Sequence, residues 1–386
     1  MSPMRVALVY NQKKEDASQQ PVPEDATEPP SLSADCSPAL ATRFLQLPSP
    51  QTLNDLYAEW DTAETIDAVA AAIGQLHHVT LIEADEEAYE KLALNRPDLV
   101  FNVAEGMHGV SREAQIPSML ELLQIPYTGS DPLTLALCLD KSRAKEILAY
   151  HHIPTPRFCV ISEKSQVSAS RLRDGGVRFP VVVKPLHEGS SKGIFNSSLV
   201  KDVTELRRQV SMLHSIYEEP VIVEEYLCGR EFTVAMIGNG DSVTVLPIVE
   251  INFDSLPAGV NPIYSYEAKW IWDRPDAPLD IFECPARIPS PLQRAIGRVC
   301  RKAYAVLRCR DWCRLDVRLD ASGIPHVLEL NPLPGILPNP KDNSCFPKAA
   351  RAAGLSYDRL IQTVLALAAR RCGLADRNPT FDSASS

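Results

Sequence analysis

At 386 residues the chain is long enough for two or three domains with a sizeable core. Its hydrophobic content of 45% and charged content of 23% are ordinary for a globular protein, and no stretch approaches the ~18–20 apolar residues of a membrane span. The formal net charge of −10, without a long basic run, argues against nucleic acid or a membrane surface as a partner.

The ten cysteines indicate a reducing compartment, because they are scattered singly and none forms a CxxC pair. Cys309 and Cys313 lie four positions apart, but no second pair completes a zinc site. The amino-terminal apolar run is too short for a signal peptide and has no cleavage pattern. We therefore predict reduced cysteines and a cytoplasmic location.

The first third of the chain predicts alternating strands and helices. Residues 4–10 form the first strand, and residues 61–76 form a helix that Asp61 caps while Glu64 completes a capping box. The intervening residues 12–55 are rich in Pro, Ser, Gln and Glu, which is typical of a mobile insertion. Further strands are expected at 78–84, 98–106 and 125–130, and helices at 85–94 and 113–123. This alternation predicts a parallel sheet with helices on both faces.

A second unit begins after Asp131-Pro132 with a long helical pattern, and a third follows near residue 229. The expected elements are a helix at 133–152, strands at 157–162, 180–186, 220–227, 231–238 and 243–251, a Pro-rich loop at 254–291, and helices at 291–307 and 355–371. We predict a mixed α/β and α+β chain. Its units are 1–135, 136–228 and 229–376, with a flexible tail at 377–386.

Residues 314–332, RLDVRLDASGIPHVLELNP, predict a strand pair with charge on one face. Leu315, Val317 and Leu319 alternate on one face, which leaves the arginines and Asp316 on the other, and the return strand adds Glu329 and Asn331. A solvated sheet face is the plainer interpretation. However, Glu329 stands alone in the apolar stretch HVLEL and needs a partner.

Two neighbouring stretches have features of a nucleotide site. In VVVKPLHEGSSKGI, residues 181–194, a strand delivers Lys184 to a glycine- and serine-rich loop whose amides and hydroxyls suit phosphate. It is not a Walker A sequence, and a plain hairpin turn is the alternative. In VIVEEYLCGREFTV, residues 221–234, carboxylates stand at a strand end where a nucleotide needs adenine and ribose contacts, although a solvated strand end explains them too.

Three further positions suit an anionic reaction centre. Lys141 lies near the start of a helix, where most lysines are simply exposed. Lys269 precedes Trp270 in a long loop that could close over phosphate and exclude water. The backbone amide of Gly335, just after the charged strand pair, could meet an oxyanion.

Together and in this order, these stretches resemble the ATP-grasp superfamily, and within it the D-alanine–D-alanine ligase group. The resemblance runs from about residue 95 to residue 370 and is weaker before residue 80, where the insertion lies. It is carried by IPYTGSDPLTLALCLDKSRAK, PVVVKPLHEGSSKG, VIVEEYLCGREFTV, YSYEAKW, CRLDVRLD and LELNPLPG. It implies ATP-grasp architecture, namely an amino-terminal parallel-sheet (pre-ATP-grasp) domain followed by two ATP-grasp subdomains.

The resemblance also implies roles for individual residues. Asp316, Glu329 and Asn331 would hold two Mg²⁺ ions, with Mn²⁺ as a substitute, and Glu329 would bridge them. ATP would be bound by Lys141, Lys184, Glu188, Gly189, Ser191 and Lys269 around its phosphates, Glu224 and Leu227 beside adenine, and Glu231 at the ribose. The reacting groups would meet Arg314, Gly335, Ser190 and Glu59, the last holding a substrate ammonium.

The implied reaction joins a carboxylate to an amine through an acyl phosphate, with small amino acids or peptides as substrates and a homodimer as the family's assembly. Three departures change the substrate region. Glu105 replaces an expected histidine, Ser111-Arg112-Glu113 replaces an acidic triplet, and Trp270 replaces a tyrosine that would bond to Ser190.

These departures leave three hypotheses open. The first is a ligase with a substrate pair other than two D-alanines, and the second is a D-alanine–D-alanine ligase. The third is a non-catalytic ATP-binding regulator, against which the presence of all metal ligands and of Arg314 weighs.

Overall fold

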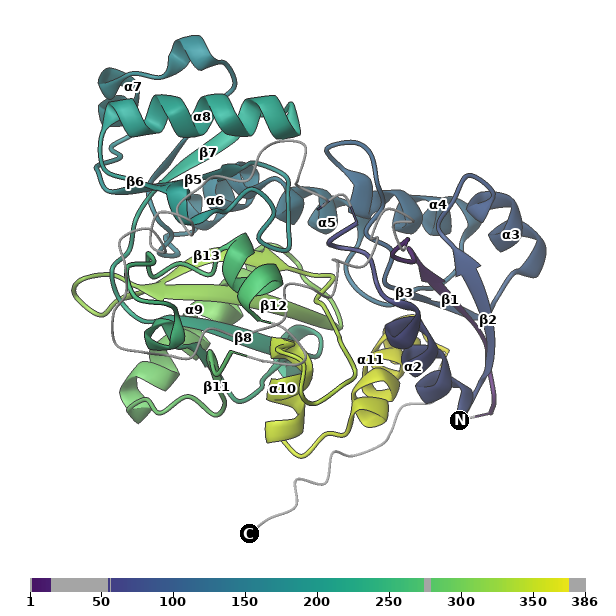
Figure 1. Cartoon of the computed structure of the whole chain (residues 1–386). Coiled ribbons are helices and arrows are strands. Elements are labelled where there is room, and N and C mark those ends of the chain that lie inside the picture. Colours follow the sequence, from purple (N-terminus) through teal and green to yellow (C-terminus); the bar gives the residue numbers. More distant parts are fainter. Residues whose placement is uncertain (1, 15–54, 56, 274–278, 375–386) are drawn as a thin grey trace, which may run out of the picture.

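The computed structural model describes residues 2–14, 55, 57–273 and 279–374, which form three sheets that follow one another along the chain (Figure 1). Most of the predicted insertion at 12–55 and the predicted tail at 377–386 lie outside the described residues. Within the described ranges, no helix combines the length and apolarity needed to cross a membrane. Every cysteine in these ranges is a free thiol.

The first sheet is parallel, as the strand–helix alternation predicted. Its strands are β1 (Arg5–Tyr10), β2 (His78–Glu83) and β3 (Leu99–Asn102), in the order β2-β1-β3. Its helices are α2 (Ala63–Gly74), α3 (Ala88–Asn95), α4 (Gln115–Leu123) and α11 (Tyr357–Arg371). Val6 and Leu8 of β1 pack with α2 and α11, whereas Ala7 and Val9 pack with α3 and α4. Helices on both faces are therefore confirmed.

The predicted capping of α2 is wrong. Thr62, not Asp61, is the N-cap, and its hydroxyl accepts a hydrogen bond from the Thr65 amide at 3.3 Å. Threonine is also a favoured N-cap residue, so the two adjacent candidates could not be separated from sequence. The Asp61 carboxylate therefore does not cap α2.

The second sheet is antiparallel, with one apolar and one polar face. Its strands are β4 (Phe158–Ile161), β5 (Val181–Pro185), β6 (Leu199–Val200) and β7 (Val221–Glu225), in the order β4-β7-β5-β6, with α7 (Ala169–Asp174) and α8 (Val203–Tyr217) beside them. Val181 and Val183 pack under α8. Because side chains alternate along a strand, Val182 and Lys184 point to the opposite face.

The helix predicted at 133–152 is two helices, α5 (Pro132–Leu139) and α6 (Lys141–Tyr150). Asp140 is extended between them, and its carboxylate accepts hydrogen bonds from the amides of Ser142 and Arg143. An aspartate inside an apolar helical pattern favours a cap because its side chain competes for backbone donors.

The third sheet is also antiparallel, in the order β11-β10-β8-β12-β13, with β9 beside β8. Its strands are β8 (Glu231–Ile237), β9 (Thr244–Val245), β10 (Val249–Ile251), β11 (Phe282–Glu283), β12 (Trp312–Leu319) and β13 (Pro325–Asn331), and its helices are α9 (Ser290–Val306) and α10 (Cys345–Ala352). α9 packs against Phe232, Val234 and Leu315 on one face. The other face carries Glu231 and Arg314, which line one cavity together with Lys184 and Glu224 of the second sheet.

Three predictions in this unit need correction. The strand expected at 243–251 is split into β9 and β10 around Pro247, which has no N–H to donate to a ladder. The expected loop at 254–291 contains a π-helical turn, Glu267–Trp272, and β11. α10 was not predicted.

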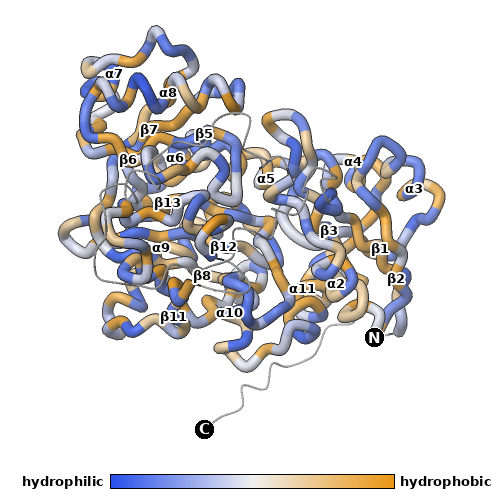
Figure 2. Tube along the Cα trace, in the orientation of Figure 1, coloured by the Kyte–Doolittle hydropathy of each residue, from blue (hydrophilic) through white to orange (hydrophobic). Residues whose placement is uncertain are grey.

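The last helix joins the first and third units. α11 packs on α2, and one apolar cluster runs from β1 through α11 to Trp312 of β12 and Phe346 of α10. Figure 2 shows apolar residues concentrated along β1, β3 and β7, the buried strands of the first two sheets. The domain limits near 135 and 229 stay predictions.

Candidate active site

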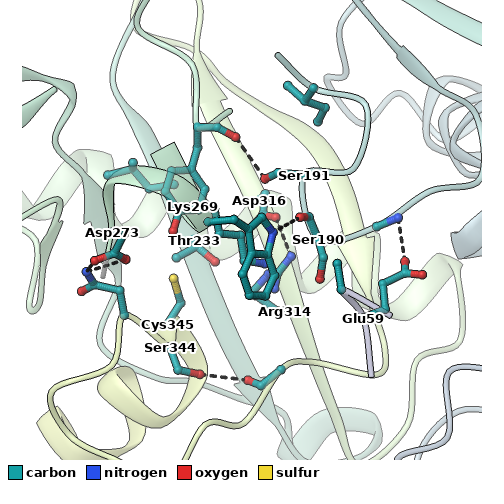
Figure 3. A pocket seen from close by; sticks show the side chains of 18 of the residues that line it. Glu59, Ser190, Ser191, Thr233, Lys269, Asp273, Arg314, Asp316, Ser344 and Cys345 are labelled. Carbon is teal, nitrogen blue, oxygen red and sulfur yellow. Dashed lines mark hydrogen bonds and ion pairs between the residues drawn. The ribbon is translucent and has the colours of Figure 1, made fainter. Parts of the chain in front are cut away.

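A cavity of about 650 Å³ lies between the facing polar sides of the second and third sheets. Its walls come from β5, β7, β8, β12 and β13, from the glycine-rich loop after β5, from the π-helical turn, and from residues 58–65 at the start of α2. Of the sixteen residues predicted to form a site, all but Lys141 and Asn331 line it. Figure 3 shows Glu59, Ser190, Lys269, Arg314 and Asp316 converging on it from these separate elements.

The floor of the cavity is the charged strand pair. Cross-strand pairing sets Asp316 opposite Glu329 and Arg314 opposite Asn331. The register shifts after Asp316, so Leu328 has no residue opposite it and lines the cavity. Arg314 Nη2 lies 3.0 Å from Asp316 Oδ2 and 3.8 Å from Glu329 Oε1. One guanidinium thus stands beside two carboxylates that would otherwise repel each other.

The pKa values of these two carboxyl groups are shifted in opposite directions. Burial raises the pKa of Glu329, but Lys184, Lys141 and Arg314 outweigh it and lower that pKa to about 2. Burial raises the pKa of Asp316, and Glu329 adds to this, while Arg314 opposes it. The lysines therefore keep Glu329 ionised.

The buried carboxylate of Glu224 holds two lysines, Lys145 and Lys184, near this strand pair. Glu224 forms ion pairs with Lys145, whose Nζ lies 3.1 Å from Oε1, and with Lys184, whose Nζ lies 3.0 Å from Oε2, and only 5% of its side chain is exposed. Burial lowers the pKa of Lys145 to about 8 despite Glu224. Lys141 lies behind this group and donates to the carbonyls of Glu188, at 2.5 Å, and Leu186, at 3.4 Å.

The glycine-rich loop is tightly shaped. Ser190 and Ser191 have φ of 50° and 62°, an uncommon left-handed conformation for residues with a Cβ that concentrates at functional sites. The amide of Gly189 donates to Glu59 Oε1 at 2.7 Å, and a Cβ at this glycine would collide with that oxygen. The loop is therefore built around Glu59.

Glu59 belongs to a closed network of charges. Arg112 Nη2 donates to Glu59 Oε1 and Oε2 at 3.0 and 2.9 Å, and also to the His187 carbonyl. Lys192 pairs with Glu188 and lies 3.6 Å from Glu59. Burial raises the pKa of Glu59, but Arg112 and Lys192 outweigh it and lower that pKa. Two cations and two carboxylates thus balance one another.

Trp270 ties the π-helical turn to the loop, because its Nε1 donates to the Ser190 carbonyl at 3.0 Å. The ammonium groups of Lys13 and Lys269 lie 5.2 and 5.1 Å from the centroid of its ring. Burial, together with Arg314, lowers the pKa of Lys269 to about 8. Two cations that have no ion pair among the described residues therefore share one indole at the edge of the cavity.

Comparisons with known proteins agree with this architecture. A family model described as D-ala D-ala ligase C-terminus matches residues 147–366. A D-alanine–D-alanine ligase of Bordetella parapertussis is 34% identical over 289 residues, covering 75% of this chain and 84% of the relative. This chain belongs to the D-alanine–D-alanine ligase-like family. It is an ATP-grasp ligase.

Two further matches bear on this family membership. An uncharacterised protein of Sinorhizobium fredii, y4sG, is 36% identical over 321 residues, which cover 81% of this chain and 89% of that protein. A crystal structure of the D-alanine–D-alanine ligase from Bacillus anthracis complexed with ATP covers 96% of this chain and 99% of its own, with a TM-score of 0.63 and 23% identity. The ATP-grasp fold expected for the ligase is confirmed.

Two residues expected at the nucleotide are engaged within this ligase. Glu224 is paired with two lysines, as described, and Glu231 accepts from Arg318 Nη1 at 2.8 Å. Arg318 is in turn held by the Tyr226 hydroxyl at 2.9 Å and the Pro262 carbonyl at 2.8 Å. Both carboxylates line the cavity, but each already has a cationic partner.

Some residues of the site were not found from the sequence. Lys145 lies four positions after Lys141 on one helix, a spacing that places both side chains on the same face, so this signal was available. The contact of Arg112 with Glu59 had no such signal, because 53 residues separate them. No hydrogen bond joins Glu59 to the Ser190 hydroxyl among the described residues, and Glu59 is held instead by Arg112 and the Gly189 amide.

Proposed function

We propose that this ligase uses ATP to join a carboxylate to an amine through an acyl phosphate, and that its substrate pair is not two D-alanines. The observation that supports it best is the strand pair that sets Asp316 opposite Glu329, with Arg314 beside them and Lys184 above. This arrangement suits phosphoryl transfer, in which catalysis consists of positioning and charge neutralisation.

The residues present fit Mg²⁺. Two carboxylates at directly opposed ladder positions disfavour each other, and a hard divalent cation that takes oxygen ligands relieves that repulsion. Asp316 and Glu329 would hold the metal, with Asn331 next along β13. When bound, Mg²⁺ supplies charge neutralisation on the phosphates.

ATP is proposed to lie between the two sheets. Val182, Leu227 and Leu328 line the cavity with apolar side chains that suit a purine, and Lys184, paired with Glu224, lines the same cavity. Lys184 and Lys269 would meet phosphate oxygens. The glycine-rich loop, tied to Trp270, would cover the phosphates and exclude water.

The chain's own groups account for the two chemical steps. A substrate carboxylate oxygen attacks the γ-phosphorus as the bond to ADP breaks. The amine nitrogen then attacks the acyl carbon, the phosphate leaves with the C–O bonding pair, and the nitrogen loses a proton to the departing phosphate. Arg314 Nε is buried and has no hydrogen-bond partner among the described residues, so it is a donor available to the oxyanion beside Gly335.

The substrate region supports a different substrate pair. Arg112 donates to both carboxylate oxygens of Glu59, and Trp270 bonds to the loop backbone where the family resemblance implies a tyrosine. A site whose buried polar groups would be left unpaired by a substrate discriminates against it by up to ~10⁴–10⁵-fold. The curated relatives that are 32–34% identical and named D-alanine–D-alanine ligase favour the alternative, synthesis of D-alanyl-D-alanine.

The test is ADP release with MgATP across a panel of amino acids and dipeptides, singly and in pairs. We expect release to require a pair that excludes two D-alanines. Formation of D-alanyl-D-alanine at saturating ATP with a turnover near ~1–10³ s⁻¹ would establish the alternative instead. ATP binding without release under any condition would favour the non-catalytic regulator.

A further inference from the structure

Residues 58–65 form one wall of the cavity, and the carboxylates of this wall belong to Glu59, Asp61 and Glu64. Glu59 is the most deeply placed, but its oxygens already accept three hydrogen bonds, two from Arg112 and one from the Gly189 amide. Glu188 across the cavity is paired with Lys192. A cationic substrate group therefore finds no free carboxylate at either position.

Asp61 differs from both. Its carboxylate lines the cavity and has no hydrogen bond or ion pair within the described part of the chain. Its backbone is fixed, since its amide donates to the Asn11 carbonyl at 3.1 Å and its own carbonyl accepts from the Lys13 amide at 2.7 Å. The side chain is thus held at the cavity wall with no partner among the residues that the structure describes.

The surroundings of Asp61 show which group would suit it. Burial raises the pKa of Asp61 to about 7, so a cation that pairs with it would also stabilise its charged form. The charge of Asp61 also acts on Tyr357, whose phenol pKa is raised by burial and then by Asp61, and the Tyr357 hydroxyl donates to the Ile336 carbonyl at 2.9 Å. Asp61 and Gly335 line the same cavity, in which the new bond is proposed to form.

We propose that Asp61, rather than Glu59, holds the ammonium group of an amino-acid substrate. This inference rests on the proposed ligase function and names the anchor within that site. Arg112 is the cation that pairs with Glu59. The carboxylate of Asp61 therefore recognises the substrate in place of Glu59. The carboxyl end of the same amino acid would then reach toward Arg314 and Gly335.

The test compares the wild type with Asp61→Asn, which keeps the shape and removes the charge, Asp61→Glu, which restores it, and Glu64→Gln. The last removes a carboxylate from the same wall and serves as the matched control. Calorimetric titration of each amino acid in the presence of ADP measures binding without requiring turnover, and KM and kcat are measured for any active pair.

We expect Asp61→Asn to weaken the binding of one amino acid by ~10- to 10³-fold, with the KM for ATP within about twofold of wild type. Asp61→Glu should recover part of the loss, and Glu64→Gln should bind normally. An analogue with hydrogen in place of the ammonium should bind wild type and Asp61→Asn equally.

Two results would overturn the inference: binding to Asp61→Asn as tight as to wild type, or an equal loss for the analogue. Asp61-dependent binding without any ADP release would instead reject the ligase proposal and leave the anchor in place.

Discussion

Arg112 is a guanidinium buried to 6% exposure, and its contact with Glu59 at 8% exposure is the kind of ion pair whose single removal is costly. We predict that Arg112→Met lowers the free energy of unfolding by ~3–5 kcal/mol, because Glu59 and Glu188 would then share Lys192 alone. Urea denaturation would measure this. Arg143→Met, at an exposed pair with Glu146, should cost under ~1 kcal/mol.

The double variant Arg112→Met with Glu59→Gln separates coupling from general damage. It should recover much of the loss, because no uncompensated charge is left in the site. A double variant as unstable as the sum of the two single variants would show that the ion pair does not account for the effect.

Glu329 gives the sharpest test of the proposed reaction centre. Glu329→Gln keeps the shape of the side chain and removes the charge that the lysines hold ionised, so ADP formation should fall by at least ~10³-fold. The melting temperature should fall moderately while the protein stays folded, because Lys184, Lys141 and Arg314 lose the carboxylate whose charge they stabilise. Glu146→Gln on the exposed face of α6 is the control, and near-normal turnover of Glu329→Gln would contradict the metal assignment.

At the scale of elements, His187 links three loops: its own loop after β5, the loop before β7 and the junction between α5 and α6. Its Nδ1 lies 2.9 Å from Glu219, just before β7, and its Nε2 lies 3.6 Å from Asp140, between α5 and α6. Burial lowers the pKa of His187, but hydrogen bonds to Asp140 and Glu219 outweigh it and raise that pKa to about 9. The loop after β5 is thereby anchored by a protonated imidazole.

Because the folded-state pKa is raised above 6.5, this stabilisation is fully present below pH 6.5 and is lost as pH rises toward 9. We predict that wild type loses ~1–3 kcal/mol of unfolding free energy between pH 6.5 and 9.5 relative to His187→Asn. Denaturant unfolding across that range would measure it. Parallel curves for the two proteins, with His151→Asn as an exposed control, would contradict the role of His187.

The elements that the sequence predicted well are those with strong local patterns. The alternation of Leu315, Val317 and Leu319 identified β12, and its pairing with β13 then placed Asp316 opposite Glu329 as expected. Asp140 was missed as a break because the apolar helical pattern continues across it, and only its cap hydrogen bonds mark the end of α5. Pairing between distant segments, such as Glu59 with Arg112, has no local pattern and requires the fold.

At the scale of the whole molecule, Asp311 joins segments from all along the chain. Its carboxylate is fully buried and accepts from the Gly129 amide at 2.8 Å, Asn239 Nδ2 at 2.7 Å and Arg371 Nη2 at 2.8 Å. These donors belong to the end of the first unit, the turn after β8, and α11. The role of Asp311 could not be read from the sequence, because its partners lie 60 or more residues away.

We predict that Asp311→Ala costs ~3–5 kcal/mol, because it leaves the Arg371 guanidinium without its carboxylate partner and removes the buried acceptor of the Gly129 and Asn239 donors. Differential scanning calorimetry should show one transition at a lower temperature, since α11 ties the first and third units into one apolar cluster. Asp241→Ala, in an exposed turn, is the control. Two separate transitions in the variant would show that the units are coupled through Asp311 alone.

The Arg112 side chain has a consequence for any molecule designed to enter this cavity. A guanidinium on the same chain competes for Glu59 at an effective concentration of at least the millimolar range, and it never diffuses away. An amine in solution would have to displace Arg112 from Glu59 and also supply a new partner for the displaced arginine. Inhibitors of relatives in which the corresponding carboxylate is open would therefore lose their amine contact here, whereas a compound that leaves Arg112 in place and reaches Asp61 would be selective for this protein.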